Sequence, residues 1–204
     1  TSSEEVEATA SALMEMGVNA WTMQADLSNL EDIHFLISRA NEISNLYALI
    51  NNASIFKSIN LLDSTDSDWE EHLRVNLTAP FILTREFARN YTRSETGRII
   101  NLLDWRAFRP GKDHFPYTIS KAGLAALTKA SALNLAPGII VNGIALGAIL
   151  PPEGESETQD ILKSVPAKRW AEMREFEETI LFLLEGPEYI TGEIIHLDGG
   201  RHLV

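Results

Sequence analysis

Apolar and polar positions along the chain follow helical and extended periods in turn. The first segment opens with a capping-box pattern, Ser2 followed three residues later by Glu5, and is rich in Ala, Glu and Met until Gly17. Because glycine commonly ends a helix, the chain is predicted to begin with a helix that reaches about Met16.

The next stretch adds a strand, a helix and a second strand. Val18–Ala25 is predicted to be a strand, and Ser28 is predicted to cap a helix that extends to about Ser44. Leu46–Ile50 is a short apolar run of the kind found in strands buried on both faces.

The same alternation continues towards the carboxyl end. The predicted elements are a helix from about Asp66 to Tyr91, a strand Arg98–Leu103, a helix from about Phe115 to Ala136, a strand Ile139–Ala145, a helix of about Ala171–Glu185 and a strand Gly192–Leu197. Residues 146–170 interrupt this rhythm with prolines, a glycine and scattered acids. Long loops inside compact domains are usually functional or disordered, so this stretch is a candidate lid over a substrate.

Strands and helices that alternate at this spacing form crossover units around a parallel sheet. The fold class is therefore predicted to be α/β: a single domain over residues 1–204, with a Rossmann-like doubly wound sheet of five strands and helices on both faces. Ligands bind such sheets at the carboxyl ends of the strands. Asp26, Asn51–Ser54, Asp104 and residues 146–155 each follow a predicted strand, so the candidate chemistry is expected at that edge.

Composition narrows the classes of partner. The 204 residues are 45% hydrophobic and 23% charged, which is ordinary globular composition. The net charge of −12 opposes binding to nucleic acid and to anionic membranes, and no apolar run approaches the length of about 20 residues that a membrane helix needs. The absence of cysteine excludes disulfides and thiolate metal sites and fits a reducing compartment, so we expect a soluble, cytoplasmic protein.

Tyr117 and Lys121 are four residues apart at the start of a predicted helix, so their side chains share a face. A nearby ammonium is expected to lower the pKa of the phenol from about 10 towards the working range of an acid–base catalyst. Such a tyrosine can protonate a carbonyl or an imine while hydride arrives. The alternative is that both residues simply lie on a helix surface.

Further patterns accompany this pair in a fixed order. They are Asn51–Ser54 at the end of a strand, Val75–Leu77 inside a helix, Asp104 at the end of a second strand and Asp198–Gly200 after the last strand. Together with Tyr117 and Lys121, this order resembles the short-chain dehydrogenase/reductase family from about Asp26 to Gly200, most of the chain.

Asp104 stands thirteen residues before Tyr117, where the family usually has a serine that binds the substrate oxygen. An aspartate there resembles the pteridine reductase branch and its bacterial dihydrofolate- and dihydromonapterin-reducing relatives, which use an Asp–Tyr–Lys set. A pterin presents ring nitrogens, and a carboxylate paired with a phenol can relay protons to them. The alternative is that Asp104 replaces the serine in a decayed site or faces solvent. The carboxyl end, Asp198–Leu203, also resembles the bacterial dihydromonapterin reductases.

The resemblance assigns two further residues. Phe56 matches the position where pteridine reductases place an aromatic ring against the flat pterin, although a core phenylalanine is the alternative. Asn76 matches the family's helix-distorting asparagine, which holds a water that connects Lys121 to solvent, and asparagine is a poor helix former. A surface asparagine is the alternative.

The resemblance also implies a nicotinamide dinucleotide cofactor. It places Asp26 and Leu27 at the adenine edge. It places Tyr117 and Lys121 at the nicotinamide ribose. The remaining cofactor-side residues are Asn52, Ala53 and Ser54 at the ribose and nicotinamide, and Gly147 and Ile149 at the carboxamide.

The first residues bear on the choice between the two nicotinamide cofactors. Ser2 and Ser3 fall where the family reads the adenosine ribose, and hydroxyls there would accept a 2′-phosphate. This favours NADP(H) over NADH, although helix capping explains both serines equally well.

Two features depart from the family pattern. The Gly-rich phosphate loop and the first two strands are absent, so about thirty residues are expected to precede Thr1 in the natural protein; without them we expect poor folding and weak nucleotide binding. Leu146 replaces the proline that usually precedes Gly147. The five histidines show no ligand spacing, so no metal site is predicted.

The sequence therefore predicts an NADPH-dependent reductase of a pterin or dihydropterin, with Tyr117 as proton donor and Asp104, Lys121 and Asn76 in support. One alternative is a short-chain carbonyl reductase, such as an oxoacyl reductase, and another is a catalytically silent nucleotide-binding or assembly protein of the same fold. The expected partners are a small pterin-like molecule and further copies of the chain, as a tetramer formed through the helices 66–91 and 115–136.

Overall fold

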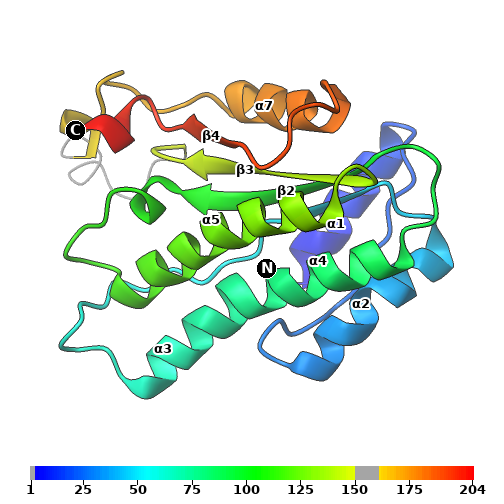
Figure 1. Cartoon of the computed structure of the whole chain (residues 1–204), viewed down its shortest axis with the longest axis horizontal. Helices are drawn as coiled ribbons and strands as arrows, with labels where there is room; N and C mark the ends of the chain where they lie inside the picture. The colour runs from blue at the N-terminus through cyan, green and yellow to red at the C-terminus, as the bar shows by residue number, and fades with distance from the viewer. Residues whose placement is uncertain (1–2, 150–160) are drawn as a thin grey trace.

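The fold is seen in a computed structural model, which describes residues 3–149 and 161–204. One parallel sheet runs in the order β1 (Ala48–Asn51), β2 (Gly97–Asp104), β3 (Ile139–Leu146) and β4 (Ile194–Leu197) (Figure 1). β2 pairs with β3 along its whole length, and β1 and β4 are shorter partners on either side. The predicted parallel α/β arrangement is confirmed.

Helices cover both faces of this sheet. Figure 1 shows α7 (Met173–Glu185) on one side, and α4 (Ala79–Asn90) and α5 (Phe115–Leu135) on the other. Three further helices in the described part of the chain are α1 (Ser3–Glu15), α2 (Leu30–Ile43) and α3 (Asp66–Leu73). Ile100, Leu102 and Ile144 bury one face of the sheet against Leu183 of α7. On the opposite face, a core made by α2, α4 and α5 covers β2 and β3.

The predicted strand Val18–Ala25 is wrong, because this segment pairs with no strand in the described part of the chain, which has four strands instead of five. An extended segment becomes a strand only when a neighbour takes up its N–H and C=O groups. Among residues 3–149 and 161–204, β1 hydrogen-bonds to β2 alone, so no described strand lies between it and residues 18–25.

The start of the helix α2 also differs from prediction. Its N-cap is Asn29, whose Oδ1 accepts a 3.0 Å hydrogen bond from the backbone N of Glu31, and the predicted cap Ser28 is wrong. Ser28 is held instead by Asp26, whose Oδ1 accepts bonds of 2.8 Å from both the N and the Oγ of Ser28. A carboxylate two residues upstream therefore competes for the serine that would have capped the helix.

The predicted helix from about Asp66 to Tyr91 is nearly continuous but is interrupted by one wide turn. Arg74–Thr78 forms a π-helical turn between α3 and α4, and Asn76 lies inside it, fully buried. Such turns displace one residue from the regular helical spacing and often occur at functional sites. The helix-distorting position predicted for Asn76 is thus observed.

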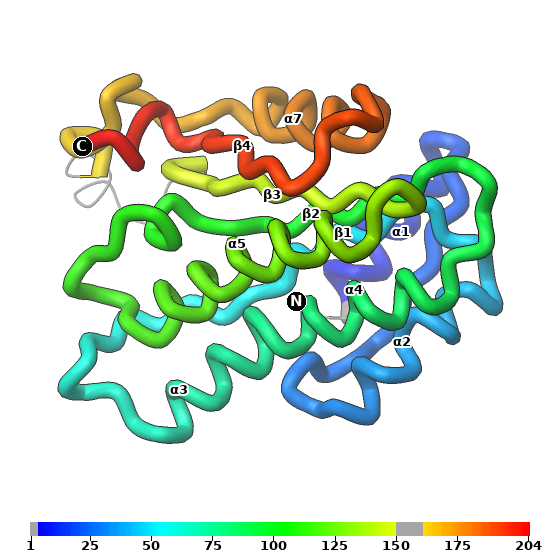
Figure 2. The backbone as a smooth tube through the Cα atoms, in the orientation of Figure 1, coloured from blue at the N-terminus to red at the C-terminus, as the bar shows by residue number. Residues whose placement is uncertain are grey.

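The carboxyl ends of the strands gather at one end of the molecule, where the chain also terminates (Figure 2). The 3₁₀ turns η2 (Trp105–Ala107) and η3 (Arg201–Leu203) lie there too. Of the predicted loop 146–170, residues 150–160 lie outside the described residues. No helix in the described ranges combines the length and apolar character needed to cross a membrane.

Candidate active site

The site is built where β2 ends and α5 begins. Asp104 is the last residue of β2 and caps η2, and Tyr117 and Lys121 lie in the first two turns of α5. α5 starts abruptly because His114 has a left-handed backbone (φ 54°) and Pro116 occupies the first turn, where a missing N–H costs nothing. Starting in this way, α5 presents the face that carries Tyr117 and Lys121 to the carboxyl end of β2.

Tyr117 and Asp104 are joined directly. The Oη of Tyr117, a 6% exposed residue, donates a 3.1 Å hydrogen bond to Oδ2 of Asp104, and the backbone N of Arg106 donates a 2.7 Å bond to Oδ1. Burial raises the pKa of Asp104 and, together with the neighbouring carboxylate charge, raises the pKa of Tyr117. Asp104 therefore faces the site and not solvent, and the pKa values of both groups lie above their ordinary values.

Lys121 is 3% exposed, and its Nζ donates a 2.8 Å hydrogen bond to the carbonyl oxygen of Leu102 in β2. Burial lowers the pKa of Lys121 to about 8, although the charge of Asp104 opposes this shift. The expected lowering of the Tyr117 pKa by Lys121 is wrong for this structure. Nζ lies 5.7 Å from the centre of the Tyr117 ring, and burial and Asp104 dominate the phenol.

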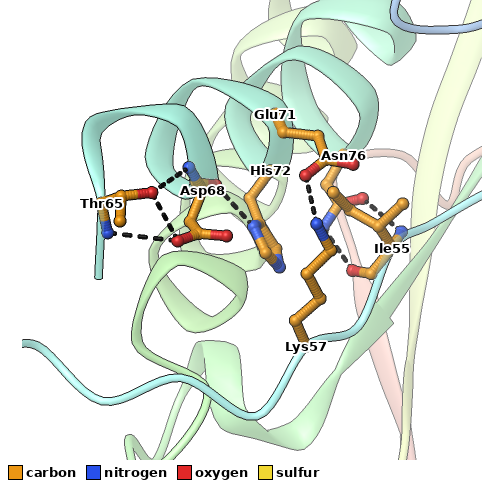
Figure 3. A network of polar contacts seen from close by, with 7 residues as sticks. All are labelled: Ile55, Lys57, Thr65, Asp68, Glu71, His72 and Asn76. Carbon is orange, nitrogen blue, oxygen red and sulfur yellow. Dashed lines mark hydrogen bonds and ion pairs between the residues drawn. The ribbon is translucent and has the colours of Figure 1, made fainter. Parts of the chain in front are cut away.

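Asn76 ties the loop after β1 to the helices. Its side chain accepts a 2.8 Å hydrogen bond from the backbone N of Ile55 and donates one of 3.0 Å to the carbonyl of Ile55, as Figure 3 shows. Ser54 donates a further bond of 3.2 Å to the same Asn76 oxygen. Nearby, Lys57 is paired with Glu71 of α3 (Figure 3). The segment that carries Ser54 and Phe56 is therefore anchored on the π-helical turn.

Ser120 is a buried member of the site that sequence reasoning missed. Its Oγ donates a 2.7 Å bond to the carbonyl of Tyr117 and receives a 3.0 Å bond from Nδ2 of Asn76. This hydroxyl links the Asn76 anchor to the helix turn that carries the phenol. Its position between Tyr117 and Lys121, on the inward face of a predicted helix, was the available signal.

Phe56 borders the phenol and is not a core residue. Its ring is 55% exposed, stacks on His114 with centroids 4.0 Å apart, and meets Tyr117 edge-on at 4.6 Å. Asp113 accepts hydrogen bonds from His114 (2.7 Å) and from Arg106 (2.8 Å). These bonds outweigh burial and lower the pKa of Asp113 to about 2. None of Arg106, Asp113 and His114 was predicted from the sequence.

The expected cofactor-side residues are only partly brought together. Leu27, Asn52 and Ala53 line one cavity of about 210 Å³ at the carboxyl end of β1. Asp26 does not line this cavity; it is exposed, and its carboxylate accepts a hydrogen bond from Ser28. Asn51 also lines the cavity, and its buried Oδ1 has no hydrogen-bond partner in the described structure. A group with hydrogen-bond donors fits such a lining.

The other predicted cofactor positions lie at the ends of the described chain segments. Gly147 follows β3 and donates a 3.0 Å backbone bond to the carbonyl of Leu197, and Ile149 is half-buried two residues later. Ser2 lies outside the described residues, and Ser3 is the first residue of α1. Within the described part of the chain, no group of three His, Asp or Glu side chains is arranged to hold a metal ion.

Comparison with known proteins identifies the family. A family model described as Enoyl-(Acyl carrier protein) reductase matches residues 1–202. A short-chain dehydrogenase/reductase from Serratia marcescens BCRC 10948 superposes with a TM-score of 0.91 at 28% identity, over 99% of this chain and 84% of that one. This chain is a short-chain dehydrogenase/reductase. It is therefore an oxidoreductase, as the order of its motifs predicted.

Two relatives bear on the branch of this short-chain dehydrogenase/reductase. The 3-oxoacyl-[acyl-carrier-protein] reductase FabG of Aquifex aeolicus is 33% identical, over 98% of this chain and 84% of the relative. The FolM alternative dihydrofolate reductase 1 of Brucella canis, solved in complex with NADP, superposes with a TM-score of 0.92 at 34% identity, over 100% of this chain and 81% of that one. The second is a neighbour of the kind expected for the pteridine reductase-like branch.

Proposed function

We propose that this short-chain dehydrogenase/reductase is an NADPH-dependent reductase of a pterin or dihydropterin. The observation that carries the proposal is the hydrogen bond from Tyr117 to Asp104, beside the exposed ring of Phe56. A serine could bind a ketone oxygen, but a carboxylate that shares a proton with a phenol suits a ring nitrogen that must be protonated. The similarity to the Brucella canis structure supports this choice.

NADP(H) is the proposed cofactor, and the NADP in that related structure supports it. The cavity lined by Leu27, Asn52 and Ala53 would hold the dinucleotide from its adenine edge at Leu27 towards the ribose at Asn52 and Ala53, where the orphaned Asn51 oxygen can accept a hydrogen bond. Lys121 and the backbone of Gly147 and Ile149 would hold the nicotinamide side, and Ser2 and Ser3 the 2′-phosphate. When bound, the reduced nicotinamide supplies hydride to a carbon of the substrate ring.

The chain's own residues supply the accompanying proton. Tyr117 holds its proton at neutral pH because burial and Asp104 raise its pKa, so it can act as a donor to the ring nitrogen. Once the phenol has given up its proton, the Asp104 carboxyl, hydrogen-bonded to Oη of Tyr117, is the route by which a proton from solvent can return to it, because burial raises the pKa of this carboxyl. Lys121, with a pKa of about 8, remains mostly charged at pH 7 and offsets the negative charge that develops.

The flat substrate would lie against Phe56. This ring exposes one side while its other side stacks on His114 at 4.0 Å, so it is fixed without being covered. Asn76 and Ser120 are positioning residues in this scheme, because they fix the loop and the helix turn that carry Phe56 and Tyr117.

The experiment that tests the proposal mixes the purified chain with NADPH and dihydrobiopterin and follows the nicotinamide absorbance. Stoichiometric oxidation of NADPH that depends on the pterin supports the proposal. A chain that oxidises NADPH with a 3-oxoacyl thioester and not with the pterin would instead be the oxoacyl reductase. That second candidate is favoured by the 33% identity to the Aquifex aeolicus enzyme.

The same fold offers a surface for self-association, and we propose a homotetramer. A mostly apolar groove of about 480 Å³ runs between α4 and α5, lined in part by Phe81, Ala88, Leu127 and Ala130. Phe81 is 44% exposed within one chain, so a second chain would bury it. Light scattering on the protein as it elutes from a size-exclusion column should give the mass of four chains. The Leu127→Glu substitution should lower this measured mass.

A further inference from the structure

Two arginines from distant parts of the chain meet beside the proposed active site. Arg106 belongs to η2, directly after Asp104, and Arg201 belongs to η3 near the carboxyl end. Both guanidinium groups lie against the buried ring of Trp105, with Cζ at 4.8 Å from its centroid for Arg106 and 4.2 Å for Arg201. Cation–π attraction holds both groups in place and leaves hydrogen-bond donors free to point elsewhere.

The backbone around Arg201 is tightly constrained. Gly199 and Gly200 both have positive φ, at 61° and 85°, and a Cβ on Gly199 would approach Val165 to 2.8 Å. Asp198 then accepts bonds of 2.9 Å from the backbone of Gly200 and 2.8 Å from that of His202. Arg201 is therefore presented by a rigid turn and not by a loose chain end.

The two guanidinium groups are incompletely paired. Nε of Arg106 and Nε of Arg201 are both buried and have no hydrogen-bond partner in the described structure. Arg106 bonds Asp113 through its Nη2 at 2.8 Å, and the carboxylates within electrostatic range of Arg201 are Asp104 and Asp113. Burial and the charge of Arg106 lower the pKa of Arg201. A further anion beside the two guanidinium groups would offset the repulsion that remains between them.

Further basic residues extend this cluster away from Asp104. Arg109 follows η2 on an exposed turn and lines a cavity of about 410 Å³ together with Lys163 and Lys168. A chain with a net charge of −12 thus has three basic residues around this cavity, and one of them, Arg109, lies within electrostatic range of Arg201. A local positive field of this kind attracts an anion that the protein as a whole would repel.

We propose that Arg201, together with Arg106 and Arg109, is a subsite for a negatively charged group on the substrate, beyond the ring that faces Tyr117. This inference rests on the proposed pterin reductase activity and deepens it. The group is a carboxylate or a phosphate carried on the pterin side chain, because both present oxygens to the forked donors of arginine. The enzyme then prefers an anionic pterin to a neutral one.

The test compares matched substrates on the full chain with NADPH. The carboxylate arm pairs dihydrofolate with dihydrobiopterin, and the phosphate arm pairs dihydroneopterin phosphate with dihydroneopterin. In the substrate pair that matches the natural substrate, Arg201→Gln should raise KM for the anionic substrate of the pair about tenfold or more. It should change KM for the neutral substrate of the pair less than about twofold. Arg201→Lys should keep part of the preference. The surface variant Arg174→Gln, which removes one charge from the α7 pair with Glu178, should change neither.

An equilibrium titration separates failure of the subsite from failure of the proposed reaction. With NADP⁺ present, which cannot reduce the ligand, folate and neopterin phosphate should each be titrated against wild type and Arg201→Gln. About tenfold weaker binding of one of them in the variant supports the subsite even if no pterin is turned over. Equal binding of both anions to the two proteins overturns it, and so does an equal loss of binding for the neutral ligands biopterin and neopterin, titrated in the same way.

Discussion

Asp104 and Tyr117 stand thirteen residues apart in the chain and share a 3.1 Å hydrogen bond at the carboxyl end of β2. The bond places the proposed proton donor beside its proposed source of replacement protons. Both side chains are held by backbone structure, Asp104 by the N–H of Arg106 and Tyr117 by the first turn of α5. The pair is therefore positioned before any substrate arrives.

Removing the phenol hydroxyl should stop the chemistry and spare the cofactor site. Tyr117→Phe keeps the ring that contacts Phe56 but removes the proton donor, so turnover should fall about a hundredfold or more. The affinity for NADPH, measured by quenching of protein fluorescence, should change little. Retained turnover would refute the role of Tyr117.

The carboxylate of Asp104 is the group that we propose sets the substrate class. Asp104→Ser introduces the residue usual in the family and removes the proton relay, so reduction of dihydrobiopterin should fall about a hundredfold. Asp104→Asn is the control for shape, because the amide keeps the size but carries no exchangeable carboxyl proton; it should lose activity to a similar extent. If Asp104→Ser reduces the pterin as well as wild type does, the assignment to this branch fails.

Lys121 should make folding stability depend on pH. Its pKa is about 8 in the folded chain against 10.5 as an ordinary lysine, so the unfolded state binds more protons between these values. The free energy of unfolding should therefore rise with pH in this window, by up to about 1.4 kcal/mol per pH unit. Lys121→Met removes this titration, so the difference between wild type and variant isolates it.

The measurement is urea unfolding of both proteins at several values between about pH 7 and pH 9.5. Staying below pH 10 avoids the ionisation of Tyr117, whose raised pKa makes stability fall as pH rises above the ordinary tyrosine value. Wild type should gain stability relative to Lys121→Met by up to about 2 kcal/mol across the range. A constant difference would show that the Lys121 ammonium is not desolvated.

The parallel fold followed from periodicity, but its outer strand did not. Val18–Ala25 has the apolar pattern of a strand, yet a strand exists only where a neighbour accepts its hydrogen bonds, and β1 offers its bonds to β2 alone. The apolar pattern of a segment indicates whether its residues favour an extended backbone. Whether the segment pairs as a strand depends on the other strands of the sheet. The same limit explains Ser28, whose backbone N and Oγ donate to Asp26 instead of the side chain capping α2.

The site was predictable where spacing alone determines proximity. Tyr117 and Lys121 share a helix face, and Asp104 ends a strand at the same edge, so the sequence placed these groups near one another. The pKa of Tyr117 could not be predicted in this way, because burial and a hydrogen bond depend on tertiary packing. Arg201 was missed for the same reason, since it contacts Trp105 from a distant segment, and so was the bond that Ser120 receives from Asn76.

A substitution at Gly147 tests how closely the end of β3 must pack against Asp198, the residue that precedes the turn carrying Arg201. A Cβ at Gly147 would lie 2.6 Å from both Cα and Cβ of Asp198, a backbone contact that no rotamer change can relieve. Gly147→Ala should therefore lower the free energy of unfolding by about 1–3 kcal/mol. Gly138→Ala is the matched control, because its nearest atom is a carbonyl oxygen 3.9 Å away, and it should be nearly neutral.

The Gly147→Ala substitution should also displace the turn that carries Arg201. Asp198 accepts the backbone bonds that fix this turn, so a shift of Asp198 moves η3 with it. In the Gly147→Ala variant, the preference for anionic over neutral pterins should fall more than the rate with the neutral substrate. If unfolding shows equal stability for Gly147→Ala and Gly138→Ala, the close packing of β3 against Asp198 is not what holds η3 in place.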